Sequence, residues 1–131
     1  MADQPVKASR VFKSAWFAKA ARKARIGDKE LCEAIAEIMK GQADDLGGGV
    51  FKKRLNKNMH RSIVLARGKK VWVYEYLFAK KDRANIEAGE LAAFRQLAKG
   101  YEALSDMQIA MLVENRDLWE ICHGGEKQVQ K

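Results

Sequence analysis

The sequence predicts a single α+β domain: a small antiparallel sheet of three to five strands, with a helical hairpin before it and helices after it. Apolar residues recur at helical spacing in the first and last thirds of the chain, whereas the middle third is rich in β-branched and aromatic residues. At 131 residues the chain has the length of one domain. We expect that domain over residues 10–123, between a flexible leader at 1–9 and a flexible tail at 124–131.

A short strand and two helices are expected first. Residues 10–13 can form the strand, and Ser14 can cap a helix that Gly27 stops. Asp28 is then placed to cap a second helix, which Gly41 ends. The second helix carries one apolar stripe, formed by Leu31, Ile35, Ile38 and Met39. The two segments together predict a helical hairpin.

Three strands are expected next. The glycine run at 47–49 marks the entry into a new element. Strand patterns then cover residues 50–55, 61–66 and 71–78, and Gly68 lies in a hairpin turn between the last two. These strands should pair as an antiparallel meander.

The last third returns to helical spacing. An amphipathic helix is expected through residues 91–104, and the capping box Ser105–Gln108 begins a shorter one. Residues 118–121 could add a final short strand. We expect the helices to pack on one face of the sheet.

Basic residues are concentrated in the predicted sheet. The chain has a net charge of +8, and the stretch from Val50 to Arg83 alone holds eleven Lys and Arg against two acidic residues. A local excess of this size indicates a polyanion or an acidic protein as partner.

Strand alternation sorts these bases by face. Lys52 and Arg54 should point the same way, with Phe51 and Leu55 on the opposite, core face. Lys53 then falls on the core face, where it fits only at the rim of the sheet with its ammonium in water.

Further bases should lie near this pair. Arg61 begins the neighbouring strand, and three more bases follow the third strand, at Lys80, Lys81 and Arg83. Such a cluster neutralises phosphates and makes RNA binding sensitive to salt. We expect RNA contacts from Lys53, Lys57, His60, Lys80 and Arg83.

The same residue types can cleave RNA. The 2′-hydroxyl of the substrate can act as nucleophile, so the protein must withdraw a proton, stabilise charge on the phosphorane and protonate the leaving 5′-oxygen. Lysine can serve as the base if neighbouring cations lower its pKa, and arginine can stabilise the transition-state charge. The aromatic residues of the third strand can stack on bases or move a proton, although ordinary strand packing is the expectation for most of them.

Metal-binding and membrane patterns are missing from the sequence. Cys32 and Cys122 form no C-x-x-C motif, and His60 and His123 are far apart, so we expect neither a metal nor a cofactor. Cys32 is expected to be a small buried residue. Without a signal peptide or a long apolar run, a cytoplasmic, reduced setting and no membrane partner are expected.

Three stretches of the sequence resemble the RelE/HigB group of type II toxins. They are Leu46–Leu55, Arg61–Leu65 and Phe78–Ile86, and the resemblance extends over residues 10–121. It implies a RelE/ParE-like fold and a toxin that cleaves messenger RNA in the ribosomal A site until a cognate antitoxin binds it. It also implies a catalytic set at Lys52, Arg54, Arg61 and Lys81. Met59 and His60 depart from the glycine and aromatic that often precede the arginine.

Two other functions remain open. A ParE-like toxin has the same fold and inhibits DNA gyrase without catalysis, but it should not need the Lys52, Arg54 and Arg61 constellation. A nucleic-acid-binding module that never cuts would share the basic sheet. The resemblance also implies a helix-turn-helix antitoxin, with the ribosome and messenger RNA as further partners.

Overall fold

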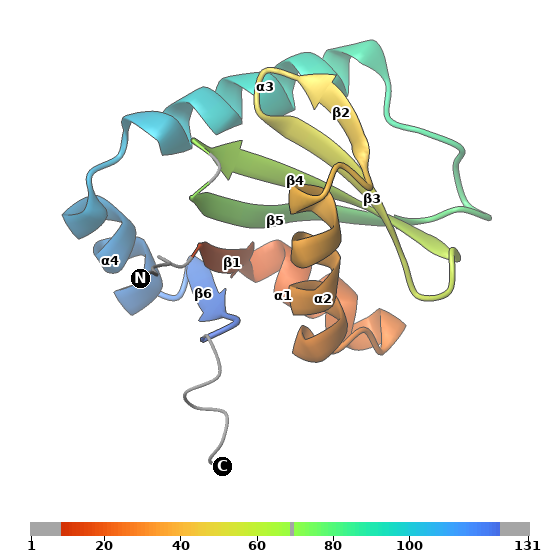
Figure 1. Ribbon diagram of the computed structural model, residues 1–131, viewed down its shortest axis with the longest axis horizontal. Helices are drawn as coiled ribbons and strands as arrows, with labels where there is room; N and C mark the ends of the chain where they lie inside the picture. Colours follow the sequence, from red (N-terminus) through yellow and green to blue (C-terminus); the bar gives the residue numbers. More distant parts are fainter. Residues whose placement is uncertain (1–8, 69, 124–131) are drawn as a thin grey trace.

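The computed structural model describes residues 9–68 and 70–123. Within these residues a six-stranded sheet has helices on both sides (Figure 1). Apart from Ser9, the expected leader and tail lie outside the described residues. In chain order the elements are β1 (Arg10–Ser14), α1 (Ala15–Ala24), α2 (Asp28–Met39), β2 (Asp44–Gly47), β3 (Val50–Leu55), β4 (His60–Arg67), β5 (Val71–Ala79), α3 (Ala88–Ala103), α4 (Asp106–Glu114) and β6 (Leu118–Ile121).

The predicted N-terminal hairpin is confirmed. The Ser14 hydroxyl caps α1 by accepting a hydrogen bond from the Phe17 backbone N–H at 3.0 Å. Gly27, not Asp28, is the N-cap of α2. Asp28 is the first helical residue instead, where its carboxylate suits the positive end of the helix dipole and pairs with Lys13 Nζ at 2.8 Å.

The sheet is larger than predicted and is mixed. Strands β3, β4 and β5 form the expected antiparallel meander. However, β1 lies between β5 and β6 and runs parallel to β5, so the expectation of a purely antiparallel sheet was wrong. The chain leaves β1 into the helical hairpin and returns to the same sheet, and this crossover allows parallel pairing. Strand β2, which pairs with β3, was not predicted from the sequence.

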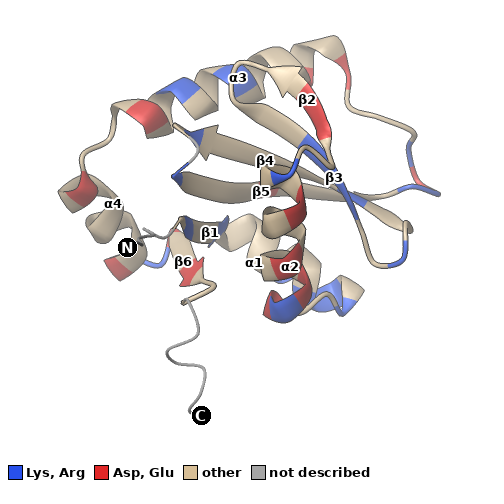
Figure 2. Cartoon of the chain, in the orientation of Figure 1, with Lys and Arg blue, Asp and Glu red and all other residues tan. Residues whose placement is uncertain are grey.

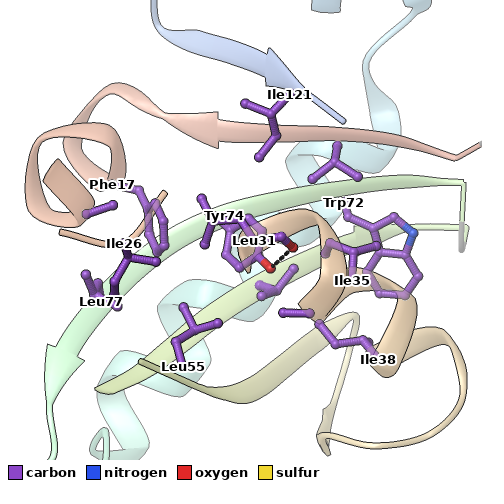
Figure 3. Close-up of a cluster of buried hydrophobic side chains, with 14 residues drawn as sticks. Phe17, Ile26, Leu31, Ile35, Ile38, Leu55, Trp72, Tyr74, Leu77 and Ile121 are labelled. Carbon is purple, nitrogen blue, oxygen red and sulfur yellow. Dashed lines mark hydrogen bonds between the residues drawn. The ribbon is translucent and has the colours of Figure 1, made fainter. Parts of the chain in front are cut away.

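Helices cover both faces of the sheet rather than one. The hairpin α1–α2 buries one face, where Phe17, Leu31 and Tyr74 are fully buried (Figure 3). The Tyr74 hydroxyl donates to the Leu31 carbonyl at 2.6 Å within this cluster. Helices α3 and α4 pack on the opposite face around a second cluster that includes Phe12 and Ile109, buried with Val50, Ile63, Leu65, Val71, Val73, Ala98 and Leu118. Met39, expected in the apolar stripe of α2, is instead 49% exposed.

The two cysteines form a disulfide. Cys32 on α2 is bonded to Cys122, which follows β6, across 90 residues of sequence. Cys32, expected to be a small buried residue, is instead only partly buried and is disulfide-bonded, because β6 pairs with β1 and so brings the C-terminal cysteine beside α2. Disulfides are typical of oxidising compartments, and the reduced setting expected from the sequence would instead keep these two cysteines as neighbouring thiols.

None of the helices in the described residues combines the length and the apolar character needed to cross a membrane.

Candidate nucleic-acid interface

Three of the predicted catalytic side chains share one face of the sheet. Arg54 and Arg61 are directly opposite each other on β3 and β4, and Lys52 is opposite Ile63. Residues opposite each other in an antiparallel pair point to the same side, so all three lie on the face that carries α3. The α3-side cluster contains Ile63, which identifies that face.

The two arginines have no acidic partner among the described residues. Arg61 donates to the carbonyls of Asn58 and His60, at 3.0 and 3.2 Å. No salt bridge in the described part of the chain involves Arg54 or Arg61. Like charges directly opposite each other destabilise a sheet. The pair therefore presents positive charge that the fold itself does not neutralise.

Lys52 is more closely held. Its ammonium lies 3.2 Å from the Asn85 side-chain oxygen and 3.7 Å from an Asp44 carboxylate oxygen. Asp44 belongs to β2 and Asn85 to the loop before α3, so two elements orient Lys52 beside the arginines. Neither partner was foreseen, because nothing in the sequence placed β2 or the loop next to β3.

The turn between β3 and β4 determines where β4 begins and so positions Arg61, its second residue. Asn56, Lys57 and Asn58 all have positive φ, at 55°, 53° and 72°. Asparagine tolerates this left-handed conformation, whereas lysine does so at a cost. The turn is held by the Asn56 side-chain nitrogen, 3.1 Å from His60 Nδ1, and presents Lys57 at its tip.

Lys53 lies on the opposite face from Lys52 and Arg54. Its ammonium pairs with Glu37 on α2 at 2.7 Å and donates to the Gln42 carbonyl at 2.9 Å. The hydrogen bond from Lys53 lowers the pKa of the Glu37 carboxyl. The face predicted from alternation is correct, but the ammonium is held by Glu37 and Gln42 rather than by water, and the Lys53 side chain is only 11% exposed.

The loop after β5 returns to the same end of the sheet as Arg61. His60 is opposite Ala79, and the Lys80 N–H donates to the Met59 carbonyl at 2.9 Å. Lys80 and Lys81 are exposed in this turn. Figure 2 shows basic segments gathered here, at the β3–β4 tip, the loop after β5 and the end of α1.

Arg83 is bound within this loop. Its guanidinium donates to Glu90 on α3 at 3.1 Å, to the Tyr76 hydroxyl at 3.3 Å, and lies 5.5 Å from the Phe78 ring centre. The hydrogen bond with Glu90 raises the pKa of Arg83 and lowers that of Glu90. Arg83 thus anchors the loop to α3, a role that the sequence analysis did not foresee.

A cleft of about 750 Å³ opens beside the end of β5. Its walls come from α1, the start of β4, the end of β5 and the following loop, and its residues include Trp16, Lys23, Met59, His60, Tyr76, Lys80 and Lys81. Trp16 and Met59 are 52% and 57% exposed. The sequence analysis identified neither residue as part of a site, because α1 and β5 meet only in the folded chain.

The aromatic residues of β5 divide between core and cleft. Trp72 and Tyr74 are buried under the hairpin, as strand packing predicts. Tyr76 is half-buried and lines the cleft. Among the described residues, no group of His, Cys, Asp or Glu side chains gathers in a way that could hold a metal ion.

In a comparison with protein families, residues 9–121 match the RelE toxin of the RelE/RelB toxin–antitoxin system. Neither the curated proteins nor the solved structures contain a match to this chain. Toxins of this family are generally ribonucleases, and each acts with a cognate antitoxin as partner. The matched region includes every described strand and helix and the basic face of β3 and β4. The chain therefore belongs to the RelE toxin family of toxin–antitoxin systems.

Proposed function

We propose that this toxin is a ribosome-dependent endoribonuclease that cuts messenger RNA at the basic face of β3 and β4. The observation that carries the proposal is the cross-strand pair of Arg54 and Arg61. Two cations held opposite each other cost stability unless an anion joins them. A phosphate with two negative oxygens during the reaction is such an anion.

The reaction needs no cofactor. The 2′-oxygen attacks the adjacent phosphorus, the bond from phosphorus to the 5′-oxygen breaks, and a 2′,3′-cyclic phosphate and a free 5′-hydroxyl result. One proton leaves the 2′-hydroxyl and one reaches the 5′-oxygen. Arg54 and Arg61 would stabilise the phosphorane, an effect for which the loss of one donor costs about 100-fold or more in rate.

The remaining bases would position the strand. Lys52 is oriented beside the arginines, and Lys81 is exposed in the turn next to the start of β4. These two complete the proposed catalytic set. Lys57, His60 and Lys80 would bind flanking phosphates or bases. Lys53 and Arg83, bound by Glu37 and Glu90, would contribute long-range positive potential.

We extend the proposal to the partners. The toxin would act in the cytoplasm, where it meets the ribosome and translated messages. A small helix-turn-helix antitoxin with an acidic segment would cover the basic face and prevent RNA from entering.

Replacing Arg61 tests the proposal. Arg61→Ala should abolish growth arrest when the protein is induced in bacteria, and mapping of messenger RNA ends should show that codon-aligned cuts disappear. Arg67→Ala is the matched control, because it removes the same charge from the other end of β4. The control should still arrest growth and cut messages.

Other outcomes would contradict the proposal. If the wild-type protein arrests growth while messages stay intact and DNA is damaged, the toxin acts on gyrase instead. A folded Arg61→Ala variant that still cuts messages would remove the assigned site. An absence of any toxicity would indicate a binding module that does not cut.

A further inference from the structure

The cleft beside β5 lies on an edge that the sheet leaves open. Strand β1 pairs with β5 only as far as Lys13 opposite Tyr74, and then the chain turns away as α1. In the described part of the chain, no strand pairs with this edge of β5 beyond Tyr74. Helix α1 forms the facing wall, so the cleft lies between a strand edge and a helix.

Trp16 is a fixed and exposed aromatic surface in this cleft. Its ring is stacked on Tyr76 with 5.1 Å between centres and an angle of 27°. Tyr76 is itself packed against Phe78 and Phe94 and receives a hydrogen bond from Arg83. About half of Trp16 nevertheless remains in solvent, since it is 52% exposed. A large apolar ring held still at the surface is suited to stacking with a ligand.

Positive charge surrounds this ring. Lys23 of α1, with Lys80 and Lys81 of the loop, lines the cleft, and Asp82 is its only acidic lining residue. Arg83 also lines it, but its guanidinium is bound to Glu90. An aromatic platform with unneutralised cations around it matches the chemistry of single-stranded nucleic acid, whose bases stack while its phosphates bind lysine.

The cleft adjoins the basic face, because Phe78 lines the cleft and lies directly opposite Arg61. His60 lines the cleft, and the next residue, Arg61, points to the α3 side. An RNA strand that passes around the adjoining ends of β4 and β5 can therefore place a phosphate at Arg61 and a neighbouring base in the cleft.

We propose that this cleft binds one unpaired nucleobase of the RNA substrate, stacked on Trp16, with adjacent phosphates on Lys80 and Lys81. This inference rests on the proposed function, because it names where a nucleotide next to the cut is held. It adds a base-binding site at the open edge of β5, beside the face that carries Lys52, Arg54 and Arg61.

Binding of a non-cleavable RNA tests the site. The probe is a hexamer of adenosine with 2′-O-methyl riboses, compared with six versions that each lack one base. Removing one particular base should weaken binding to the wild-type protein by about tenfold, which is the scale of one base–aromatic stack. The same removal should have no effect on Trp16→Ala, and Trp16→Phe should restore most of the sensitivity.

Trp119→Ala provides a matched control. Trp119 is 44% exposed, it lies on β6, and it is not among the cleft residues. This variant should keep the full sensitivity to the missing base. Equal sensitivity in wild type and Trp16→Ala would overturn the proposal.

Cleavage on programmed ribosomes covers the case in which the free hexamer does not bind. Trp16→Ala should then lose the wild-type preference between purine and pyrimidine beside the cut, and Trp119→Ala should keep it. An unchanged preference in Trp16→Ala would also overturn the proposal. So would a Trp16→Ala variant that binds the antitoxin more weakly but handles RNA normally, because the cleft would then be a protein-docking site.

The two proposals fail in different ways. A wild-type protein that cuts messages without any dependence on Trp16 contradicts only the base site. A wild-type protein that stacks the base on Trp16 but never cuts contradicts only the proposed function.

Discussion

Lys53 and Arg54 are neighbours in sequence, yet the two faces of the sheet treat them differently. On the hairpin face, Lys53 pairs with Glu37 of α2, and Lys13 of β1 likewise pairs with Asp28. On the α3 face, Arg54 is opposite Arg61, and within the described residues neither has a carboxylate partner. The hairpin face thus uses its cations to attach helices, whereas the other face leaves two cations for a ligand.

This difference gives a practical rule for basic strands. A lysine or arginine that a neighbouring helix neutralises contributes to the fold, and its removal should affect stability first. A cation opposite another cation weakens the sheet, and its removal should affect function first.

The largest expected effect is on the stability of the hairpin face, where the Cys32–Cys122 bond ties α2 to the end of β6. Cys122→Ser should lower the free energy of unfolding by about 4 kcal/mol, because the bond closes a long loop in the unfolded chain. Urea denaturation of the variant measures this loss. Reductant should destabilise the wild-type protein to the same level and leave the variant unchanged. Two free thiols in the folded wild-type protein would show that the bond does not form.

The next largest effect is on RNA cleavage, and it should differ between the neighbouring residues Lys53 and Arg54 on β3. Arg54→Ala should reduce RNA cleavage by about 100-fold, the scale of one lost transition-state donor, without lowering stability. Lys53→Ala is the matched control, since it removes one positive charge from the adjacent residue and should leave the cleavage rate within about twofold. Single-turnover cleavage and thermal unfolding of both variants measure the two effects. If both variants lost cleavage equally, net charge rather than position would explain it.

The smallest effect concerns a carboxyl group on the α3-covered side. Burial raises the pKa of Glu75, partly opposed by the hydrogen bond from the Tyr101 hydroxyl at 3.2 Å. The folded-state pKa lies above the unfolded value, so stability is full below the unfolded pKa and falls as pH rises through the folded pKa. Glu75→Gln keeps an acceptor for Tyr101 and removes this ionisation. The variant should therefore gain stability relative to wild type as pH rises from about 4 to 7.

Glu120 provides a control of opposite sign. The hydrogen bond from Arg10, at 2.9 Å, lowers the pKa of Glu120, so its contribution is present at neutral pH and is lost as pH falls. Glu120→Gln should thus lose stability relative to wild type at neutral pH and match it in acid. Parallel pH profiles for the two variants would contradict both assignments.

The sequence predicts local elements well because their signals are local. The Ser14 cap, the Ser105 capping box and the bounds of β3 follow from neighbouring residues, and all three are present. The alternation of Lys52, Lys53 and Arg54 likewise predicts which of them face together. The proposed catalytic roles of these residues stay predictions.

The missed features depend on long-range contacts. Parallel pairing of β1 with β5 and the Cys32–Cys122 bond join segments that no local pattern connects. Burial on both faces did have a signal: the unbroken apolar run Ile63–Val64–Leu65 is typical of a strand covered on both sides. The sequence contains no signal for the cleft at Trp16, because nothing local distinguishes a tryptophan that lines a cleft from any other tryptophan on an amphipathic helix.

Strand β2 gives the sheet a protected border. It is short, it carries Asp44 and Asp45, and its outer side has no partner strand in the described residues. An open border of this kind can recruit the same border of another copy and so begin aggregation. If the β2 edges of two copies paired, each copy would contribute two carboxylates, and the repulsion between them opposes this pairing. This strongly basic toxin thus has a built-in defence against self-association at this edge.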